Sequence, residues 1–280
     1  MRSAIATRRC TATTVLVSAI LATAAGPAYT QQAAPAPPAA ATESQVQARA
    51  ILMRMGQFLA GAQGFSVSLR TGYDVVQKSG QKIEFDESRT IAMSRPDRLR
   101  VEGERSDGAK VQMVFTGKEI IVVDAASNVY ATAPQPGGLD ETVVHFVRDL
   151  GMRLPLAVLL VSRLPAEIEN RVRTIDYVEK TDILGTPAHH LAARTDSVDF
   201  QFWIADGAQP LPQRVVVTYR DEPGQPQFWA QFSDWNLAPA ITEATFSAQV
   251  PPGAQKMPFA AQLPRVSPAT GKTAAKKGAK

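Results

Sequence analysis

Two runs of short alternating segments, separated by one helical interruption, constrain the fold of this chain more than any other feature. In the first segment Phe65, Val67 and Leu69 alternate with polar residues. A period of two indicates strands with one buried face, and turn residues at this spacing indicate antiparallel neighbours. We therefore predict about eleven strands, beginning near 65 and covering 82–93, 98–104, 110–115, 119–123, 129–132, 174–183, 189–194, 198–204, 213–220 and 227–237, with a closing strand and turn near 245–253.

Helical spacing occurs at two places in the chain. Residues 43–62 carry an apolar stripe through Val46, Ala50 and Met53, and glycines follow the segment. Residues 139–150 have helical spacing, and residues 155–163 are apolar on nearly every side. So many strands need a way to protect their sheet edges. The pattern predicts a mainly β (α+β) protein with a strongly curved sheet or barrel and a helix at its mouth.

The first 28 residues have the order of a secretory signal. Arg2, Arg8 and Arg9 precede an uncharged stretch at 11–25, and small residues lead up to Ala28. The apolar stretch is shorter than the roughly 20 residues that a membrane-spanning helix needs. We expect cleavage near Ala28 and a periplasmic mature protein, and the alternative is a retained anchor. Cleavage would also remove Cys10, the one cysteine.

The remaining chain divides by composition into three parts. We predict an Ala/Pro-rich linker at 29–42, one domain at 43–259 and a disordered basic tail at 260–280. Of the 30 basic residues, three lie in the signal and five in the tail, which leaves 22 against 26 acidic residues. This mildly acidic body argues against nucleic acid as a partner. The tail is either a passive solvated segment or a transient contact with anionic membranes.

Four features occur in the same order as in a known family. They are the helix that leads into Phe65, the turn Ser94-Arg95-Pro96-Asp97, the turn Thr116-Gly117-Lys118 followed by the helical insertion, and Phe246 before Pro251-Pro252-Gly253. In these features the chain resembles the periplasmic lipoprotein carrier LolA and its relatives, most closely a branch of uncharacterised predicted periplasmic proteins. The resemblance covers roughly residues 43–259.

The resemblance implies a half-open antiparallel β-barrel of about eleven strands that is closed by a helical lid, residues 139–163, over an interior for acyl chains. In the carriers an arginine at the Arg-Pro turn helps to hold the lid shut. The matching residue is Arg95, which we expect to be the lid latch, with a surface turn arginine as the alternative. The linker, the tail and the lid composition differ from LolA, so the resemblance implies an apolar ligand more firmly than a lipoprotein.

Candidate ligand contacts come from the inward faces of the predicted strands and from the apolar lid. The predicted cavity wall comprises Phe65, Val67, Leu69, Phe200, Phe202, Phe228, Phe232 and Trp235. The predicted lid contacts are Val143, Phe146, Val147, Leu150, Leu156, Leu159 and Leu160. For both sets the alternative is ordinary core packing, because a barrel wall becomes a cavity only where its inward side chains fail to meet.

Few residues in the chain suit catalysis or metal binding. His189 and His190 are neighbours, so on a strand they point to opposite faces and cannot share a metal. No G-x-S-x-G, G-x-G-x-x-G or P-loop motif is present. We expect no catalytic residues, no cofactor and no metal. A hydrolase would need a nucleophile within hydrogen-bond reach of His145, His189 or His190.

The sequence therefore predicts a non-enzymatic periplasmic binding or carrier protein for a lipid, a lipoprotein acyl chain or another hydrophobic ligand. A carrier of this kind would exchange its cargo with an envelope protein that acts as donor or acceptor. The alternative is an envelope interaction or regulatory module with a packed barrel and no transported ligand.

Overall fold

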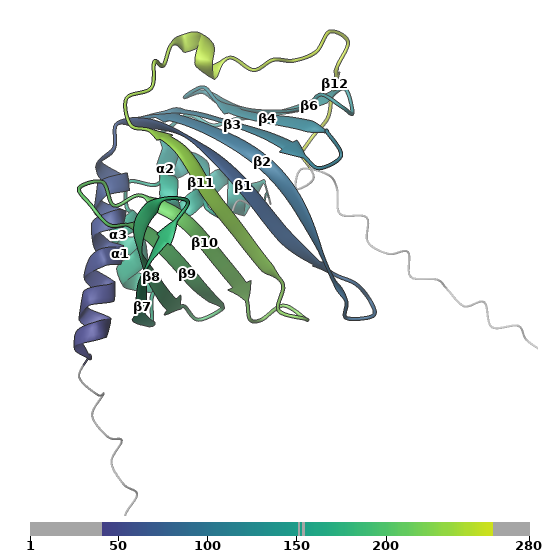
Figure 1. Ribbon diagram of the computed structural model, residues 1–280. Helices are drawn as coiled ribbons and strands as arrows, with labels where there is room; N and C mark the ends of the chain where they lie inside the picture. Colours follow the sequence, from purple (N-terminus) through teal and green to yellow (C-terminus); the bar gives the residue numbers. More distant parts are fainter. Residues whose placement is uncertain (1–40, 151, 153–154, 260–280) are drawn as a thin grey trace, which may run out of the picture. The chain divides into compact units, whose positions relative to one another are not determined.

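A single sheet of twelve strands forms the frame of the protein (Figure 1). The computed structural model describes residues 41–150, 152 and 155–259, so the predicted signal, the predicted tail and most of the linker lie outside the described residues. The strands are β1 (Gly64–Val76), β2 (Lys82–Ser94), β3 (Arg98–Arg105), β4 (Lys110–Phe115), β5 (Glu119–Asp124), β6 (Val129–Pro134), β7 (Thr174–Ile183), β8 (Thr186–Arg194), β9 (Val198–Ala205), β10 (Pro212–Tyr219), β11 (Gln227–Asn236) and β12 (Gln255–Lys256).

The strand order shows that the sheet is open. It runs β12-β6-β5-β4-β3-β2-β1-β11-β10-β9-β8-β7, so β12 and β7 are its two edges. Sequence neighbours pair as antiparallel hairpins, and β1 joins the two runs by pairing with β11. The predicted half-open antiparallel sheet is confirmed, and each of the eleven predicted strands from 65 to 237 is present.

The closing segment differs from the prediction of a strand near 245–253. Residues Glu243–Phe246 form a 3-10 turn (η3), and the chain pairs only at β12, which lies parallel to β6. Pro251 and Pro252 explain the difference, because proline has no N–H to donate to a strand ladder. Pairing therefore begins only beyond them.

Helix α1 (Glu43–Gly61) begins at a capping box. The Thr42 hydroxyl accepts from the Gln45 amide, and the Gln45 side chain accepts from the Thr42 amide. The buried face of α1 includes Leu52, Met55 and Leu59. This face packs on β7 and on α3 (Leu164–Arg171), so α1 covers the β7 end of the sheet (Figure 1). No helix among the described residues is long and apolar enough to cross a membrane.

The lid contains less regular helix than the sequence predicts. Helix α2 (Leu139–Val144) continues into a π-helical turn, η1 (His145–Asp149), which confirms the predicted helix at 139–150. The predicted helix at 155–163 is wrong, because only the 3-10 turn η2 (Ala157–Leu160) forms there. Val161 is extended, and Pro165 then opens the first turn of α3, where a missing N–H costs nothing.

The core lies between the inner face of the sheet and the helices. Phe65, Val67 and Leu69 of β1 are each no more than 3% exposed, and their alternation with outward residues matches the sequence pattern. The same core includes buried residues of α1, the lid and α3. The helices are thus held by burial of apolar surface against one face of the sheet.

The outer face of the sheet carries a row of stacked side chains. His190 lies parallel to the Trp203 ring at 4.1 Å between centroids. The Arg214 guanidinium lies 5.7 Å from the centre of Trp203 and 5.4 Å from that of Trp229, which are cation–π distances. The Trp229 indole in turn covers Gly72, and a Cβ at that glycine would overlap the indole ring. Glycine is therefore required at position 72 because the Trp229 indole lies so close to its Cα, and not because of its backbone conformation.

Replacing Gly72 by alanine should lower the free energy of unfolding by about 1–3 kcal/mol, the usual cost of overpacking. In a strand with open space above it, the same change would be neutral or stabilising. Gly61→Ala is the control, because a Cβ there meets no atom within 4 Å. Chemical denaturation of both variants measures the effect, and equal stability of the two would contradict the packing of Trp229 on Gly72.

Candidate functional site

A hollow of about 640 Å³ lies between α1, the lid, α3 and the strands β9 and β10. Its apolar lining is contributed from several elements at once. The apolar lining residues are Leu52, Met55, Val143, Val144, Val147, Pro155, Leu156, Ala157, Val158, Leu159, Val161, Leu164, Ile168, Val172, Val198, Phe200, Phe202, Val215 and Val217. Val147 and Val158 are 43% and 36% exposed, so the hollow reaches the surface on its lid side.

Strand alternation supplies one wall of this hollow. Phe200 and Phe202 are two residues apart on β9, so both point inward, with their rings edge to face at 5.6 Å. Val215 and Val217 are placed in the same way on the neighbouring strand β10. Of the eight predicted cavity-wall residues, these two phenylalanines line the hollow.

The lid residues divide between the hollow and the core. Val143, Val147, Leu156 and Leu159 line the hollow. The other three predicted lid contacts are buried in the core and do not line the hollow. They are Phe146, Leu150 and Leu160. The lid therefore presents one side to the hollow and is anchored by the other.

Packed rings cover the inner face of the neighbouring strands β1 and β11 at one end, where β1 begins and β11 ends. Trp235 contacts Phe65 edge to face at 5.2 Å and stacks on Phe232 at 5.7 Å. Its indole N–H donates to the Pro212 carbonyl at 3.0 Å, which fixes the ring. These three predicted wall residues, together with Val67 and Leu69, belong to the core and do not line the hollow.

A second hollow of about 770 Å³ adjoins the first at Pro155 and Tyr219, which line both. Phe228, the remaining predicted wall residue, lies here. The charged residues around the second hollow are Asp74, Lys78, Glu87, Arg89 and Glu222. Three carboxylates against two cations give its lining a formal charge of −1.

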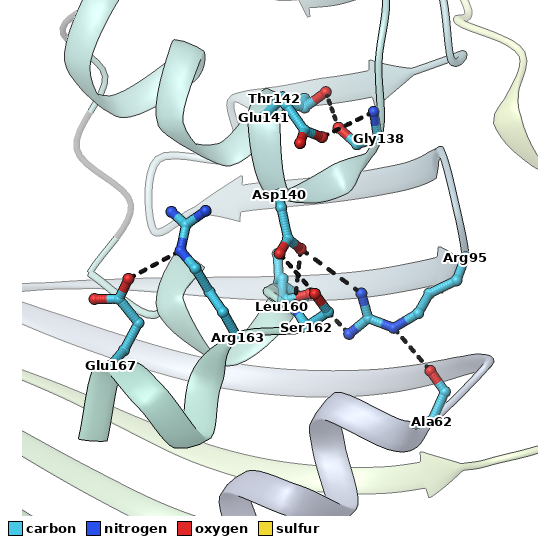
Figure 2. A network of polar contacts seen from close by, with 10 residues as sticks. All are labelled: Ala62, Arg95, Gly138, Asp140, Glu141, Thr142, Leu160, Ser162, Arg163 and Glu167. Carbon is cyan, nitrogen blue, oxygen red and sulfur yellow. Dashed lines mark hydrogen bonds and ion pairs between the residues drawn. The ribbon is translucent and has the colours of Figure 1, made fainter. Parts of the chain in front are cut away.

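Arg95 connects the end of α1 to the lid (Figure 2). Its Nε donates to the Ala62 carbonyl and its Nη2 to the Leu160 carbonyl, both at 3.0 Å. Nη1 lies 3.9 Å from a carboxylate oxygen of Asp140. Burial lowers the pKa of Arg95 and the nearby Asp140 carboxylate opposes this, while the guanidinium keeps its charge. The structure thus places the predicted latch residue against the lid.

Asp140 ties the two halves of the lid together. Its Oδ1 accepts from the Ser162 amide at 2.8 Å, and its Oδ2 accepts from the Ser162 hydroxyl at 2.7 Å (Figure 2). The carboxylate therefore joins α2 to the residues that follow η2 and also faces Arg95. Sequence reasoning missed Asp140, and the available signal was an acidic residue in the first turn of a helix that follows Gly138.

The start of α2 is fixed locally by its own side chains. Glu141 accepts from the Gly138 amide at 3.1 Å, and the Thr142 hydroxyl donates to the Gly138 carbonyl at 2.8 Å (Figure 2). The Glu141 bond satisfies a backbone N–H at the helix start that would otherwise lack a partner, and the Thr142 hydroxyl adds a second bond to a carbonyl that already accepts from the Thr142 amide. Asp140 is therefore held on a defined helical turn.

Arginines surround the mouth of the first hollow. Glu167 of α3 accepts from Arg163 at 2.9 Å and from Arg171 at 2.6 Å. Burial raises the pKa of the Glu167 carboxyl, but the two guanidiniums outweigh it, so the pKa lies below its usual range. Just after α3, hydrogen bonds from Arg173 lower the pKa of Asp196. Both carboxylates are therefore ionised at neutral pH.

Among the described hydrogen bonds, none joins a histidine to a serine, threonine or cysteine side chain, and the one hydroxyl partner is that of Tyr177 on His189. His145 contacts Asp149, His189 contacts Tyr177 and Asp206, and His190 contacts Gln201. Within the described residues, no group of three or more His, Cys, Asp or Glu side chains is placed to hold a metal. The arrangement that the geometry does offer is an apolar hollow with a charged mouth.

Comparison with known proteins gives one family match. A family model described as "Predicted periplasmic protein (DUF2092)" matches residues 48–260. None of the curated proteins compared with the chain matches it.

Solved structures with a similar architecture include an uncharacterised conserved protein from Thermus thermophilus, with 13% identity and a TM-score of 0.45 over 74% of this chain and 96% of that one. The Mycobacterium tuberculosis lipoprotein LppX has 14% identity and a TM-score of 0.41 over 69% and 98% of the two chains. A LolA superfamily protein from Nitrosomonas europaea has 10% identity and a TM-score of 0.39 over 72% and 97%.

Replacing Arg95 by lysine should lower the free energy of unfolding by about 1–3 kcal/mol, because one ammonium cannot reach both carbonyls and Asp140. Amide exchange in α2 and at Ser162 should also become faster. Arg105→Lys is the matched control, since Arg105 is half-exposed and pairs only with Asp107 among the described contacts. A control variant as destabilised as Arg95→Lys would contradict a role for Arg95 in holding the lid.

Proposed function

Since the chain belongs to the DUF2092 family of predicted periplasmic proteins, we propose that it is a non-enzymatic periplasmic protein that binds one hydrophobic ligand under its lid. The family match confirms the predicted branch and the predicted location. The ligand is a lipid, an acyl chain of a lipoprotein or a similar apolar molecule, and it lies in the hollow between α1, the lid and the strands β9 and β10. The protein acts as a carrier or a sensor for that molecule.

The observation that carries this proposal is an apolar hollow that the surrounding side chains do not fill. Its volume of about 640 Å³ lies within the roughly 300–1,000 Å³ that is usual for small-molecule sites. Leu52, Val217 and Phe202 approach it from a helix and from two strands. Water in such a space finds few polar partners, so an apolar guest is favoured.

Burial of hydrocarbon supplies the binding free energy in this account. Each buried CH₂ group contributes about 0.8 kcal/mol. The exposed lid residues Val147 and Val158 border the hollow, so an acyl chain has a route from the surface. Arg95 and Asp140 hold the lid over the chain once it is bound.

A second candidate is an envelope interaction or regulatory module with no transported ligand. The packed rings of Phe65, Phe232 and Trp235 favour it, because they fill the inner face where β1 begins and β11 ends. In that case the first hollow would be a packing defect, and an envelope partner would bind the outer surface. The two candidates differ in whether the hollow accepts hydrocarbon.

The proposal predicts a chain-length dependence of binding. With uncharged alkyl maltosides from octyl to tetradecyl, used below their micelle concentrations, the affinity should rise about fourfold per added CH₂ until the hollow is full. Isothermal titration calorimetry measures the series. Absent binding, or an affinity independent of chain length, would favour the interaction module.

A variant pair on β10 locates the site. Val217→Trp places a large ring in the hollow and should weaken dodecyl maltoside binding at least about tenfold, or 1.4 kcal/mol. Val216→Trp, on the same strand with its side chain on the opposite face, should leave the affinity within about twofold. Equal effects of the two substitutions would place the binding site elsewhere.

A further inference from the structure

We infer that the hollow selects an amphiphile with one negatively charged head group, which lies against Arg163 and Arg171 while its hydrocarbon chain occupies the apolar interior. This inference rests on the proposed function and adds the chemical class of the ligand. Two observations support it: the distribution of charge around the two hollows, and the hydrogen bonding of Arg163 and Arg171.

The charged residues that line the first hollow are mostly cationic. They are Arg148, Arg163, Arg171 and Arg173, with the carboxylates Glu167 and Asp196. Four guanidiniums against two carboxylates give the lining a formal charge of +2, or +1 once Asp149, the partner of Arg148, is counted, whereas the body of the chain is mildly acidic. A site with this balance attracts anions and repels cations.

Glu167 is shared by two guanidiniums on one side of α3. Arg163 and Arg171 lie four residues before and after it, so all three side chains share one face of the helix. The Glu167 side chain is 18% exposed, against 46% for Arg163 and 69% for Arg171. The carboxylate is thus covered by cations that face the solvent, and the cluster keeps one positive charge.

The terminal nitrogens of these two arginines are open to a ligand. Both arginines use Nε to donate to Glu167. Among the described hydrogen bonds, the Nη nitrogens of Arg163 and Arg171 have no acceptor, and Figure 2 shows those of Arg163 turned away from the carboxylate. A guanidinium fork of this kind matches a carboxylate or a phosphate head group.

The other two arginines at the mouth are already paired through two nitrogens each. Arg148 donates to both oxygens of Asp149, and Arg173 donates to both oxygens of Asp196. Their charges are therefore compensated locally. The head group is accordingly assigned to the Arg163 and Arg171 side of the mouth.

The second hollow provides an internal comparison. It is similar in size, but its lining carries a formal charge of −1, and Arg89 there forms an ion pair with Glu87. Two adjoining hollows thus have linings of opposite charge. An anionic head group is favoured at the first and disfavoured at the second, which orients the amphiphile.

The preference for a head group can be measured apart from the binding of the hydrocarbon chain by comparing three amphiphiles that have the same dodecyl-length chain and different head groups. Dodecanoate, dodecyl maltoside and dodecyltrimethylammonium are titrated in mildly alkaline buffer, where the carboxylate is ionised. We expect dodecanoate to bind about fivefold more tightly than the maltoside, as for one favourable exposed ion pair, and the cation to bind most weakly. High salt should reduce the preference. Acetate, the head group without the chain, should not compete.

The variant Arg163→Gln/Arg171→Gln should lose the preference for dodecanoate over the maltoside, so the ratio of the two affinities is the readout, and an unchanged circular dichroism spectrum shows that the variant is folded. Arg105→Gln is the matched control, an exposed arginine that pairs with a carboxylate outside both hollows, and it should keep the preference. Equal affinity for all three amphiphiles, or a preference that survives in the double variant, would overturn the inference and leave the proposed function intact. Failure of the maltoside to bind would instead refute the proposed function.

Discussion

The structure depends on one constraint, which is that an open sheet cannot cover its own inner face. With β7 and β12 as free edges, the apolar inward residues of the strands must be buried by other parts of the chain. Helix α1 covers the β7 end, and the lid and α3 pack beside it. The rings of Phe65 and Trp235 fill that face where β1 begins and β11 ends. The space left between α1, the lid and the strands β9 and β10 is the hollow to which we assign ligand binding.

The lid is positioned by polar contacts at a few points and by apolar contacts over the rest of its length. Arg95 bonds to a carbonyl at the end of α1 and to one in the lid, while Asp140 holds Ser162 through two hydrogen bonds. Arg95 and Asp140 are partly buried, and their hydrogen bonds have defined geometry, so they specify one position of the lid. Apolar lid residues alone would allow several positions. Because the polar contacts fix the position of the lid, its apolar residues can line the hollow without filling it.

The sequence predicts the strands well because alternation and turn residues are local signals. The faces of β9 follow directly, with Phe200 inward and Trp203 outward. Local patterns do not show which inward residues meet across the sheet, so Phe65 and Phe200 could not be assigned to core and hollow in advance. The 3-10 turn at Ala157–Leu160 and the role of Asp140 were also missed, since both depend on contacts between distant segments. Arg95 was found only through the family resemblance.

The most direct test is to locate the bound hydrocarbon by nuclear Overhauser effects between isotope-labelled protein methyl groups and an unlabelled dodecyl chain. The account predicts contacts to the methyl groups of Leu52, Val215 and Val217, which line the hollow. Ile83 and Leu184, exposed apolar residues that line neither hollow, should show none. Contacts confined to Ile83 and Leu184, or a chain in contact with no methyl group that lines the hollow, would contradict it.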